Sequence, residues 1–243
     1  MNTLKRKVLG VIGGLGPIAT AHFMELVIRM TDASCDQENL DMIIYNFPCI
    51  PDRTAYILDK SKENPLPRMI EIGNALASQG ADYIATPCVT AHYFCEQLKS
   101  GVSVPIINGV KETVAHLKER GVTSAGIMAT DGTVSSGLFT KELLAEGITP
   151  IIPTKEGQAD VMHLIYNNIK AGKPADMDRF FSVKDELIKS GAQAIILGCT
   201  ELSLIKRDCD IGHGFIDALE VLAQQSVVRC EKALKPEHQN LIT

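Results

Sequence analysis

The feature that most restricts the fold of this chain is an alternation of short apolar runs with longer helix-like segments. In the first half, four apolar runs alternate with three helical patterns: the runs cover 7–13, 41–48, 82–87 and 104–108, and the helices cover 18–30, 65–80 and 91–100. Short apolar runs separated by helices are typical of βαβ units, which form mainly parallel sheets with helices on both faces. We therefore predict an α/β fold.

The same order of elements restarts near residue 124. It gives apolar runs at 124–130, 148–153 and 192–198, a small-residue loop at 131–137, and helical patterns at 138–147, 159–171, 177–190 and 216–233. One long period of this kind indicates a duplicated domain. We expect two similar α/β domains, each a mainly parallel sheet flanked by helices, related by pseudo-two-fold symmetry. Residues 1–112 plus 212–243 would form the first domain, with the last helix packed on it, and residues 113–211 the second.

Each half ends one of its apolar runs on a cysteine that sits in the same sequence frame. The frame Gly-Ala-x-x-Ile-x-x-x-Cys runs from Gly80 to Cys88 and again from Gly191 to Cys199. Open parallel sheets bind ligands outside the carboxyl ends of their strands. If the two domains face each other, Cys88 and Cys199 point into one cleft from opposite sides.

Two opposed thiols are suited to acid–base chemistry on one carbon atom. Thr90 and Thr200 follow the two cysteines closely, which favours a helix start at each site, and a helix N-terminus lowers the pKa of a thiol. One thiolate would remove a proton from carbon while the opposite thiol delivers a proton to the other face. The outcome is inversion of a stereocentre, with the carboxylate of the carbanion-like intermediate held by N–H donors and hydroxyls.

The alternative for any cysteine is a buried, inert thiol. We adopt that interpretation for the five cysteines outside the repeated frame: Cys35, Cys49, Cys95, Cys209 and Cys230. A metal site built from Cys88, His92 and Cys95 lacks a convincing fourth ligand.

The composition fits a globular protein with a real core, with 45% hydrophobic and 22% charged residues in 243. A net charge of −5 without a basic stripe argues against nucleic acid as the main partner. The seven scattered cysteines form no disulfide framework or paired zinc motif, so we expect free thiols and a cytoplasmic protein. No apolar run approaches the roughly 20 residues needed to cross a bilayer.

The stretch LKRKVLGVIGGLGPIATA, residues 4–21, imitates a secretory signal peptide in its basic start, apolar middle and A-x-A ending. It is rich in glycine, contains Pro17 and runs directly into an amphipathic segment at 22–30. We therefore interpret it as a strand, a loop and the start of a helix.

Five motifs, in this order, resemble those of the aspartate/glutamate racemase family. They are GVIGGLGPIAT at 10–20, PDRTA at 51–55, TPCVTAH at 86–92, ATDGTVSSGLF at 129–139 and GCTEL at 198–202. The resemblance covers nearly the whole chain and is to cofactor-independent aspartate racemases and broader amino-acid racemases. It implies a small amino-acid substrate, no pyridoxal phosphate, no metal and a homodimer.

The resemblance also implies roles for charged and sulfur-bearing side chains. Cys88 and Cys199 would be the paired acid and base. Arg53, with Asp52 beside it, would lie near the distal carboxylate of the substrate, because the planar fork of arginine binds carboxylates through two hydrogen bonds. Lys170 matches a family lysine that supplies a second positive charge from the other domain.

The resemblance further implies that Thr90, Thr133 and Thr200 bind the α-carboxylate or the amino group. Two departures from the family pattern weaken the assignment of the substrate. Val89 stands where the family usually has Asn, which removes a polar group from the substrate-binding surface. Residues 217–218 are Asp-Ala where the family often has an acid followed by Ser or Thr.

Alternatives stay open for the individual side chains. Arg53 fits an ordinary surface or salt-bridged arginine as well, and Lys170 a lysine that stabilises a helix C-terminus. Asn46 suits either a cleft or a turn, and His92 favours a structural role because the thiols already supply both proton carriers. Glu201 either orients a neighbouring group or is simply solvated.

Three rival functions remain beside racemisation of aspartate or glutamate. A dinucleotide-binding protein is suggested by G-x-G-x-x-A at 14–19, although the second apolar run ends at Asn46 rather than at an acidic residue. A non-enzymatic amino-acid sensor would need Arg53 and Lys170 but no thiols. Broader-specificity racemases and related isomerases, such as maleate isomerase, hydantoin racemase or a decarboxylase, also use cysteines at this cleft.

Overall fold

The computed structural model describes residues 6–243, which fold around two parallel sheets. The first sheet has the order β2-β1-β3: β1 is Val8–Gly13, β2 is Asp41–Asn46 and β3 is Tyr83–Ala85. The second has the order β5-β4-β6-β7: β4 is Ser124–Ala129, β5 is Thr149–Ile151, β6 is Ala194–Gly198 and β7 is Phe215–Asp217. In each sheet the first strand lies inside the sheet, and the strand preceding a framed cysteine lies beside it, so the same arrangement of strands recurs in the two halves.

The helices surround these sheets. The α-helices are α1 Pro17–Met30, α2 Arg53–Leu58, α3 Leu66–Ser78, α4 Cys95–Gly101, α5 Gly109–Glu119, α6 Asp131–Ser135, α7 Leu138–Ala145, α8 Lys155–Met162, α9 Met177–Lys189, α10 Thr200–Asp208 and α11 Ala218–Arg229. Short 3-10 helices cover Asp36–Glu38, Val89–Phe94 and Pro236–His238, and a π-helix covers His163–Ile169. Several begin at side-chain caps; Asn108, for example, accepts from two backbone N–H groups at the start of α5.

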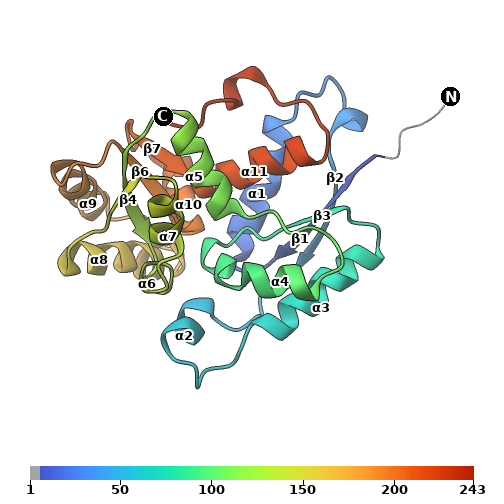
Figure 1. Cartoon of the computed structure of the whole chain (residues 1–243), viewed down its shortest axis with the longest axis horizontal. Coiled ribbons are helices and arrows are strands. Elements are labelled where there is room, and N and C mark those ends of the chain that lie inside the picture. Colours follow the sequence, from blue (N-terminus) through green and yellow to red (C-terminus); the bar gives the residue numbers. More distant parts are fainter. Residues whose placement is uncertain (1–5) are drawn as a thin grey trace.

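The two halves share one hydrophobic core. It contains Leu9 of β1, Phe23 of α1, Val110 of α5, Ile127 of β4 and Leu219 of α11, all buried. Figure 1 shows α1, α5 and α11 between the two sheets, and α11 packs against both of the other helices. The last helix therefore packs on the first domain, as expected, and also joins it to the second.

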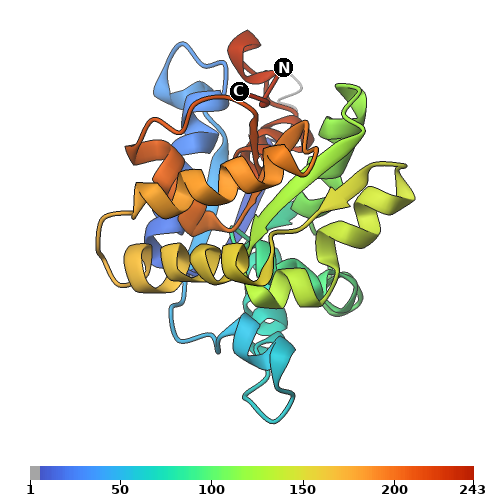
Figure 2. The ribbon, with the colours of Figure 1, turned by 90° about the vertical axis from the view of Figure 1, so that its left-hand side faces the viewer.

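Each half also has an outer core of its own. In the first half, α3 and α4 cover the outer face of the sheet, and Met69 and Leu98 are buried there. In the second half, α8, the π-helix and α9 cover the sheet (Figure 2). Leu164 and Phe180 are fully buried there. Cover on both faces explains why the inner strands β1, β4 and β6 are almost entirely buried.

Some predicted elements differ from the observed ones. Residues 104–108 form no strand and make one parallel bridge, from Ile106 to Ile84, because Pro105 has no N–H to donate to a ladder. The loop predicted at 131–137 contains α6. The helix predicted from residue 216 begins at 218, after β7.

The position of β7 changes the division into domains. The predicted boundary at residue 212 assigns Phe215–Asp217 to the first domain, but this strand pairs with β6 in the second sheet. We now propose that the second domain runs from about residue 113 to residue 217. The rest of the division stays a proposal.

The loop after β1 requires glycine at one position. Gly14 has a φ of +90°, and a Cβ atom there would lie 2.4 Å from the backbone of Phe47. This close approach packs the loop 14–16 against the end of β2 and fixes the carbonyl of Leu15 near the carboxyl edge of the sheet. Within residues 6–243, no helix is both long and apolar enough to cross a membrane.

Candidate active site

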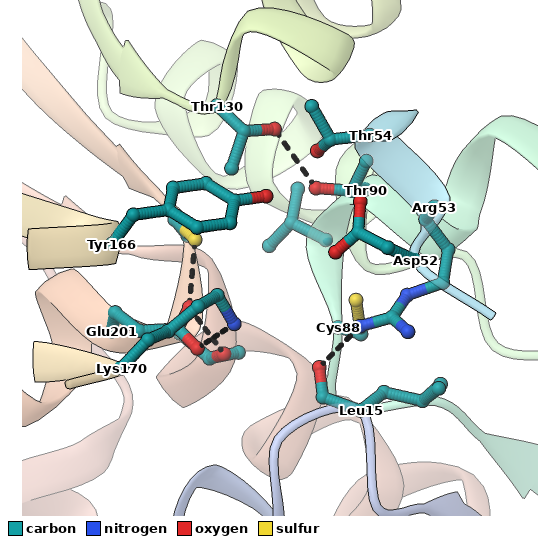
Figure 3. Close-up of a pocket in the computed structure, with 13 residues that line it drawn as sticks. Leu15, Asp52, Arg53, Thr54, Cys88, Thr90, Thr130, Tyr166, Lys170 and Glu201 are labelled. Atoms are coloured by element: carbon teal, nitrogen blue, oxygen red, sulfur yellow. Dashed lines mark hydrogen bonds and ion pairs between the residues drawn. The ribbon is translucent and has the colours of Figure 1, made fainter. Parts of the chain in front are cut away.

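One pocket collects side chains from both halves of the chain at the carboxyl ends of their strands (Figure 3). It is lined by Leu15, Asp52, Arg53, Thr54, Cys88, Val89, Thr90, Thr130, Tyr166, Lys170, Cys199, Thr200 and Glu201. Of the nine predicted site residues, eight line this pocket, and Thr133 does not.

The two framed cysteines occupy equivalent places in the pocket. Cys88 is the N-cap of the 3-10 helix Val89–Phe94, and Cys199 is the N-cap of α10. Both have extended backbone conformations, and their side chains are 7% and 5% exposed. The predicted helix starts at the two cysteines are therefore confirmed, and both thiols face the same pocket.

Cys199 lies beside a carboxylate. Its Sγ donates a hydrogen bond to Oε2 of Glu201 at 2.9 Å, and the other oxygen of Glu201 forms an ion pair with Lys170 (Figure 3). Burial and the charge of Glu201 raise the pKa of Cys199 well above its ordinary value, and the opposing charge of Lys170 does not cancel them. The predicted lowering of this pKa by the helix N-terminus is therefore wrong for Cys199.

Cys88 lies beside a cation. Figure 3 shows the guanidinium of Arg53 against the sulfur of Cys88. Burial alone would lower the pKa of Arg53, but the charges of Cys88 and Asp52 outweigh it and raise that pKa. The two thiols therefore have opposite electrostatic surroundings.

Arg53 is held in place by backbone carbonyls. Its Nη1 donates to the carbonyls of residues 50–51 at 3.3 and 3.1 Å, and its Nη2 donates to the carbonyl of Leu15 at 3.0 Å. Its buried Nε–H has no hydrogen-bond partner among residues 6–243. Arg53 is thus not a surface residue, and most of its fork binds backbone carbonyls.

A triangle of hydroxyls joins the two halves behind the pocket. The hydroxyl of Thr90 lies 3.0 Å from that of Thr130 and 3.1 Å from that of Thr133, and the last two are 3.1 Å apart. Three hydroxyls in a ring can each donate one bond and accept another. Thr133 therefore supports Thr90 from behind instead of facing the pocket. Thr200 does line the pocket, with its hydroxyl 3.4 Å from Oε2 of Glu201.

Lys170 and Tyr166 come from one side of the pocket. Tyr166 lies in the π-helix, and Lys170 caps its C-terminal end. The ammonium of Lys170 lies 5.6 Å from the centre of the Tyr166 ring. Burial alone would lower the pKa of Lys170, but the charges of Glu201 and Cys199 outweigh it and raise that pKa, so the ammonium stays protonated. Lys170 is thus more than a lysine at a helix end.

Sequence reasoning missed four lining residues: Leu15, Thr54, Thr130 and Tyr166. Tyr166 lies four positions before Lys170, a spacing that places two side chains on the same side of a helix and would have found it. Thr54 lies inside the PDRTA motif, one position after Arg53. Thr130 directly follows β4, where the carboxyl-end rule applies.

The positions of Asn46, His92 and Glu201 decide between the alternatives that the sequence leaves open for these side chains. Asn46 is exposed at the end of β2 and does not line the pocket. His92 is buried outside it, and its Nδ1–H donates to the carbonyls of Cys88 and Val89, because carbonyls only accept. Glu201 is 5% exposed and therefore not a solvated side chain. In residues 6–243, no three His, Cys, Asp or Glu side chains are grouped to hold a metal ion.

The fold and the pocket define a class: two-sheet α/β proteins in which each half directs one cysteine, from the end of an equivalent strand, into a shared pocket. The chain belongs to the Asp/Glu/hydantoin racemase family, whose model matches residues 12–226. The predicted family and fold class are thereby confirmed, and the prediction of an amino-acid racemase is confirmed at the level of the family.

Individual relatives agree with this membership. The chain is 27% identical over 225 residues to the broad specificity amino-acid racemase RacX of Bacillus subtilis (strain 168), covering 90% of this chain and 96% of that one. The structure of Picrophilus torridus aspartate racemase superposes with a TM-score of 0.82 and 31% identity, covering 97% of this chain and 99% of the other. The glutamate racemase of Persephonella marina is 27% identical over 153 residues, 61% of this chain and 57% of that enzyme.

Proposed function

We propose that this chain interconverts the L and D forms of an acidic amino acid without a cofactor, with Cys88 and Cys199 as its proton carriers. The observation that carries the proposal is the meeting of two cysteines, from equivalent strand ends of the two halves, in one pocket with two cations. Family membership and the likeness to an aspartate racemase of known structure support it.

In one direction, the thiolate of Cys88 takes the proton from the α-carbon of the substrate. The electron pair left on carbon is delocalised into the α-carboxylate, whose added charge Lys170 and nearby hydroxyls stabilise. The thiol of Cys199 then gives its proton to the opposite face of the carbon. The product is the mirror image, and the enzyme is left with a Cys88 thiol and a Cys199 thiolate. In the other direction the two cysteines exchange roles.

The charges in the pocket favour a substrate with two carboxylates. Arg53 and Lys170 are cationic, and the free Nε–H of Arg53 suits a carboxylate oxygen. Asp52 also lines the pocket, with Oδ1 accepting from the backbone N–H of residue 55, and its charge suits the substrate ammonium. Val89 adds an apolar contact where a polar one is usual in the family.

A broader substrate range is the second candidate, favoured by the apolar Val89 and by the likeness to a racemase named for broad specificity. A panel of L-amino acids in deuterated water, followed by chiral chromatography and mass spectrometry, separates the two. Exchange and inversion restricted to aspartate and glutamate support the acidic substrate, and similar rates with neutral amino acids favour the second candidate. No α-hydrogen exchange with any amino acid contradicts a racemase.

The roles of the thiols are tested with serine variants. Cys88→Ser and Cys199→Ser should each abolish inversion, while one of them retains deuterium exchange with a single enantiomer. Cys95→Ser is the matched control, because Cys95 is also buried but lies outside the pocket. Inversion by Cys88→Ser at the parent rate would show that this thiol is no proton carrier.

Three further expectations stay proposals: the division into two domains, the homodimer and the cytoplasmic location. The homodimer rests on the resemblance to the family, and the location on the free cysteines. Light scattering of the purified protein tests the homodimer, and cell fractionation tests the cytoplasmic location.

A further inference from the structure

We infer that the two thiols are unequal at rest: when the pair carries one proton, that proton stays on Cys199, which donates to Glu201, and not on Cys88, which lies beside Arg53 (Figure 3). Glu201 is then a positioning residue, which keeps the proton on Cys199. The inference rests on the proposed two-thiol function and adds to it the protonation state in which the enzyme meets its substrate.

Glu201 makes a thiolate at Cys199 unfavourable. Its Oε2 lies 2.9 Å from Sγ, in a site where both side chains are about 5% exposed. Loss of the thiol proton would place two anions at hydrogen-bond distance with little water to screen them. The ion pair of Glu201 with Lys170 holds the carboxylate in place beside the thiol.

Arg53 has the opposite effect on Cys88. Its side chain is 9% exposed, and three hydrogen bonds to carbonyls of residues 15, 50 and 51 hold it there. The fixed guanidinium places a positive charge beside Cys88, whereas the nearest partner of Cys199 is a carboxylate (Figure 3). The Nε–H of the same guanidinium has no hydrogen-bond partner in the part of the chain that the structure describes.

The difference has a kinetic consequence. The enantiomer that presents its α-hydrogen to Cys88 meets the more populated of the two forms in which the pair carries one proton. Its mirror image reacts only with the rarer form, in which Cys199 is the thiolate. The apparent affinity for this enantiomer is therefore lower, in proportion to the fraction of enzyme in that form. Because the two enantiomers are equally stable, kcat/KM must be the same for both. The second enantiomer therefore has a higher KM and a proportionally higher kcat.

Labelling of the free enzyme with iodoacetamide over a range of pH tests the inference, with each cysteine followed by tandem mass spectrometry. The pH midpoint of labelling reports the thiolate, whereas limited access changes only the plateau rate. The exposed Cys35 and Cys49 serve as internal references. We expect Cys88 to reach half its plateau at least one pH unit below Cys199, about a tenfold difference in thiolate fraction near neutral pH.

Glu201→Gln isolates the charge of the carboxylate. This variant should move the labelling midpoint of Cys199 to lower pH and leave that of Cys88 nearly unchanged. It should also bring the KM values of the two enantiomers closer together. Glu220→Gln is the matched control, because Glu220 pairs with Lys206 at 2.7 Å outside the pocket and should shift neither thiol.

Equal labelling midpoints for the two cysteines in the parent protein, or a Glu201→Gln midpoint for Cys199 equal to the parent's, would overturn the inference. The parent curves decide the first point even if Glu201→Gln does not fold. Labelling needs no turnover, so its result is independent of the exchange assay. Unequal thiols without α-hydrogen exchange would contradict the racemase function, whereas exchange with equal thiols would contradict only this inference.

Discussion

Replacing Arg53 by lysine tests whether this side chain holds the pocket together as well as carrying charge. Arg53 lies at the start of α2 and bonds to the carbonyls of Leu15, in the loop after β1, and of residues 50–51. It therefore links two loops that both line the pocket. Lysine keeps the positive charge but concentrates it in one ammonium, which cannot copy the planar fork.

The expected loss follows from the number of carbonyls left without a donor. Of the three hydrogen bonds that Arg53 makes, we expect the ammonium of the Arg53→Lys variant to keep one. Each lost bond to a charged donor destabilises by about 1.5 kcal/mol, so the free energy of unfolding should fall by about 3 kcal/mol. Loosening of the loops should lower kcat/KM at least about tenfold, which corresponds to about 1.4 kcal/mol of transition-state stabilisation.

Urea unfolding followed by circular dichroism gives the stability, and chiral chromatography gives kcat/KM. Arg68→Lys is the control, because Arg68 forms an exposed ion pair with Glu71 and should change stability by less than about 0.5 kcal/mol. If Arg53→Lys were as stable and as active as Arg68→Lys, the three carbonyl contacts would not be what holds these loops.

Three other changes test separate parts of the structure. Asp217 is buried, and burial is the main reason that its pKa is raised to about 7 in the folded protein. In the unfolded chain the same carboxyl ionises near pH 4. The free energy of unfolding therefore falls as the pH rises from about 4 to 7. Asp217→Asn should therefore gain stability relative to the parent between pH 5 and pH 8 in urea unfolding; a constant difference would refute this sign. Thr133→Val should lower the free energy of unfolding by about 1–2 kcal/mol by breaking the triangle with Thr90 and Thr130, and Thr133→Ser should restore it. Val89→Asn should raise the ratio of kcat/KM for aspartate over alanine, and an unchanged ratio would remove Val89 from substrate selection.

Most of the fold was predictable because its signal is local. The strands are apolar on both faces, and the longer helices α1, α3 and α9 have clear periodic patterns, so both kinds of element stand out in the sequence. The short helices α2 and α6 were not predicted, since five or six residues carry too little periodicity, and of α10 only the start after Cys199 was predicted. The pairing of β7 with β6 was also missed, because three residues before a helix resemble its first turn.

The site was predictable where it repeats and not where it depends on distant contacts. The shared frame identified Cys88 and Cys199 without any structure. No local pattern shows that Glu201 forms an ion pair with Lys170, 31 positions earlier in the chain, or that it accepts a hydrogen bond from the thiol of Cys199. Thr133 lies in a recognisable motif, yet only the packing of the two halves shows that it backs Thr90.

The core that both sheets share constrains the history of the molecule. If the halves descend from one duplicated unit, that unit had this apolar face open to water and would have needed a twin to cover it. Fusion of the two copies into one chain would make this pairing permanent. It would also allow the two cysteines to have different neighbouring residues, which a symmetric pair of identical chains cannot have. The carboxylate of Glu201 beside Cys199 and the guanidinium of Arg53 beside Cys88 are such a difference (Figure 3).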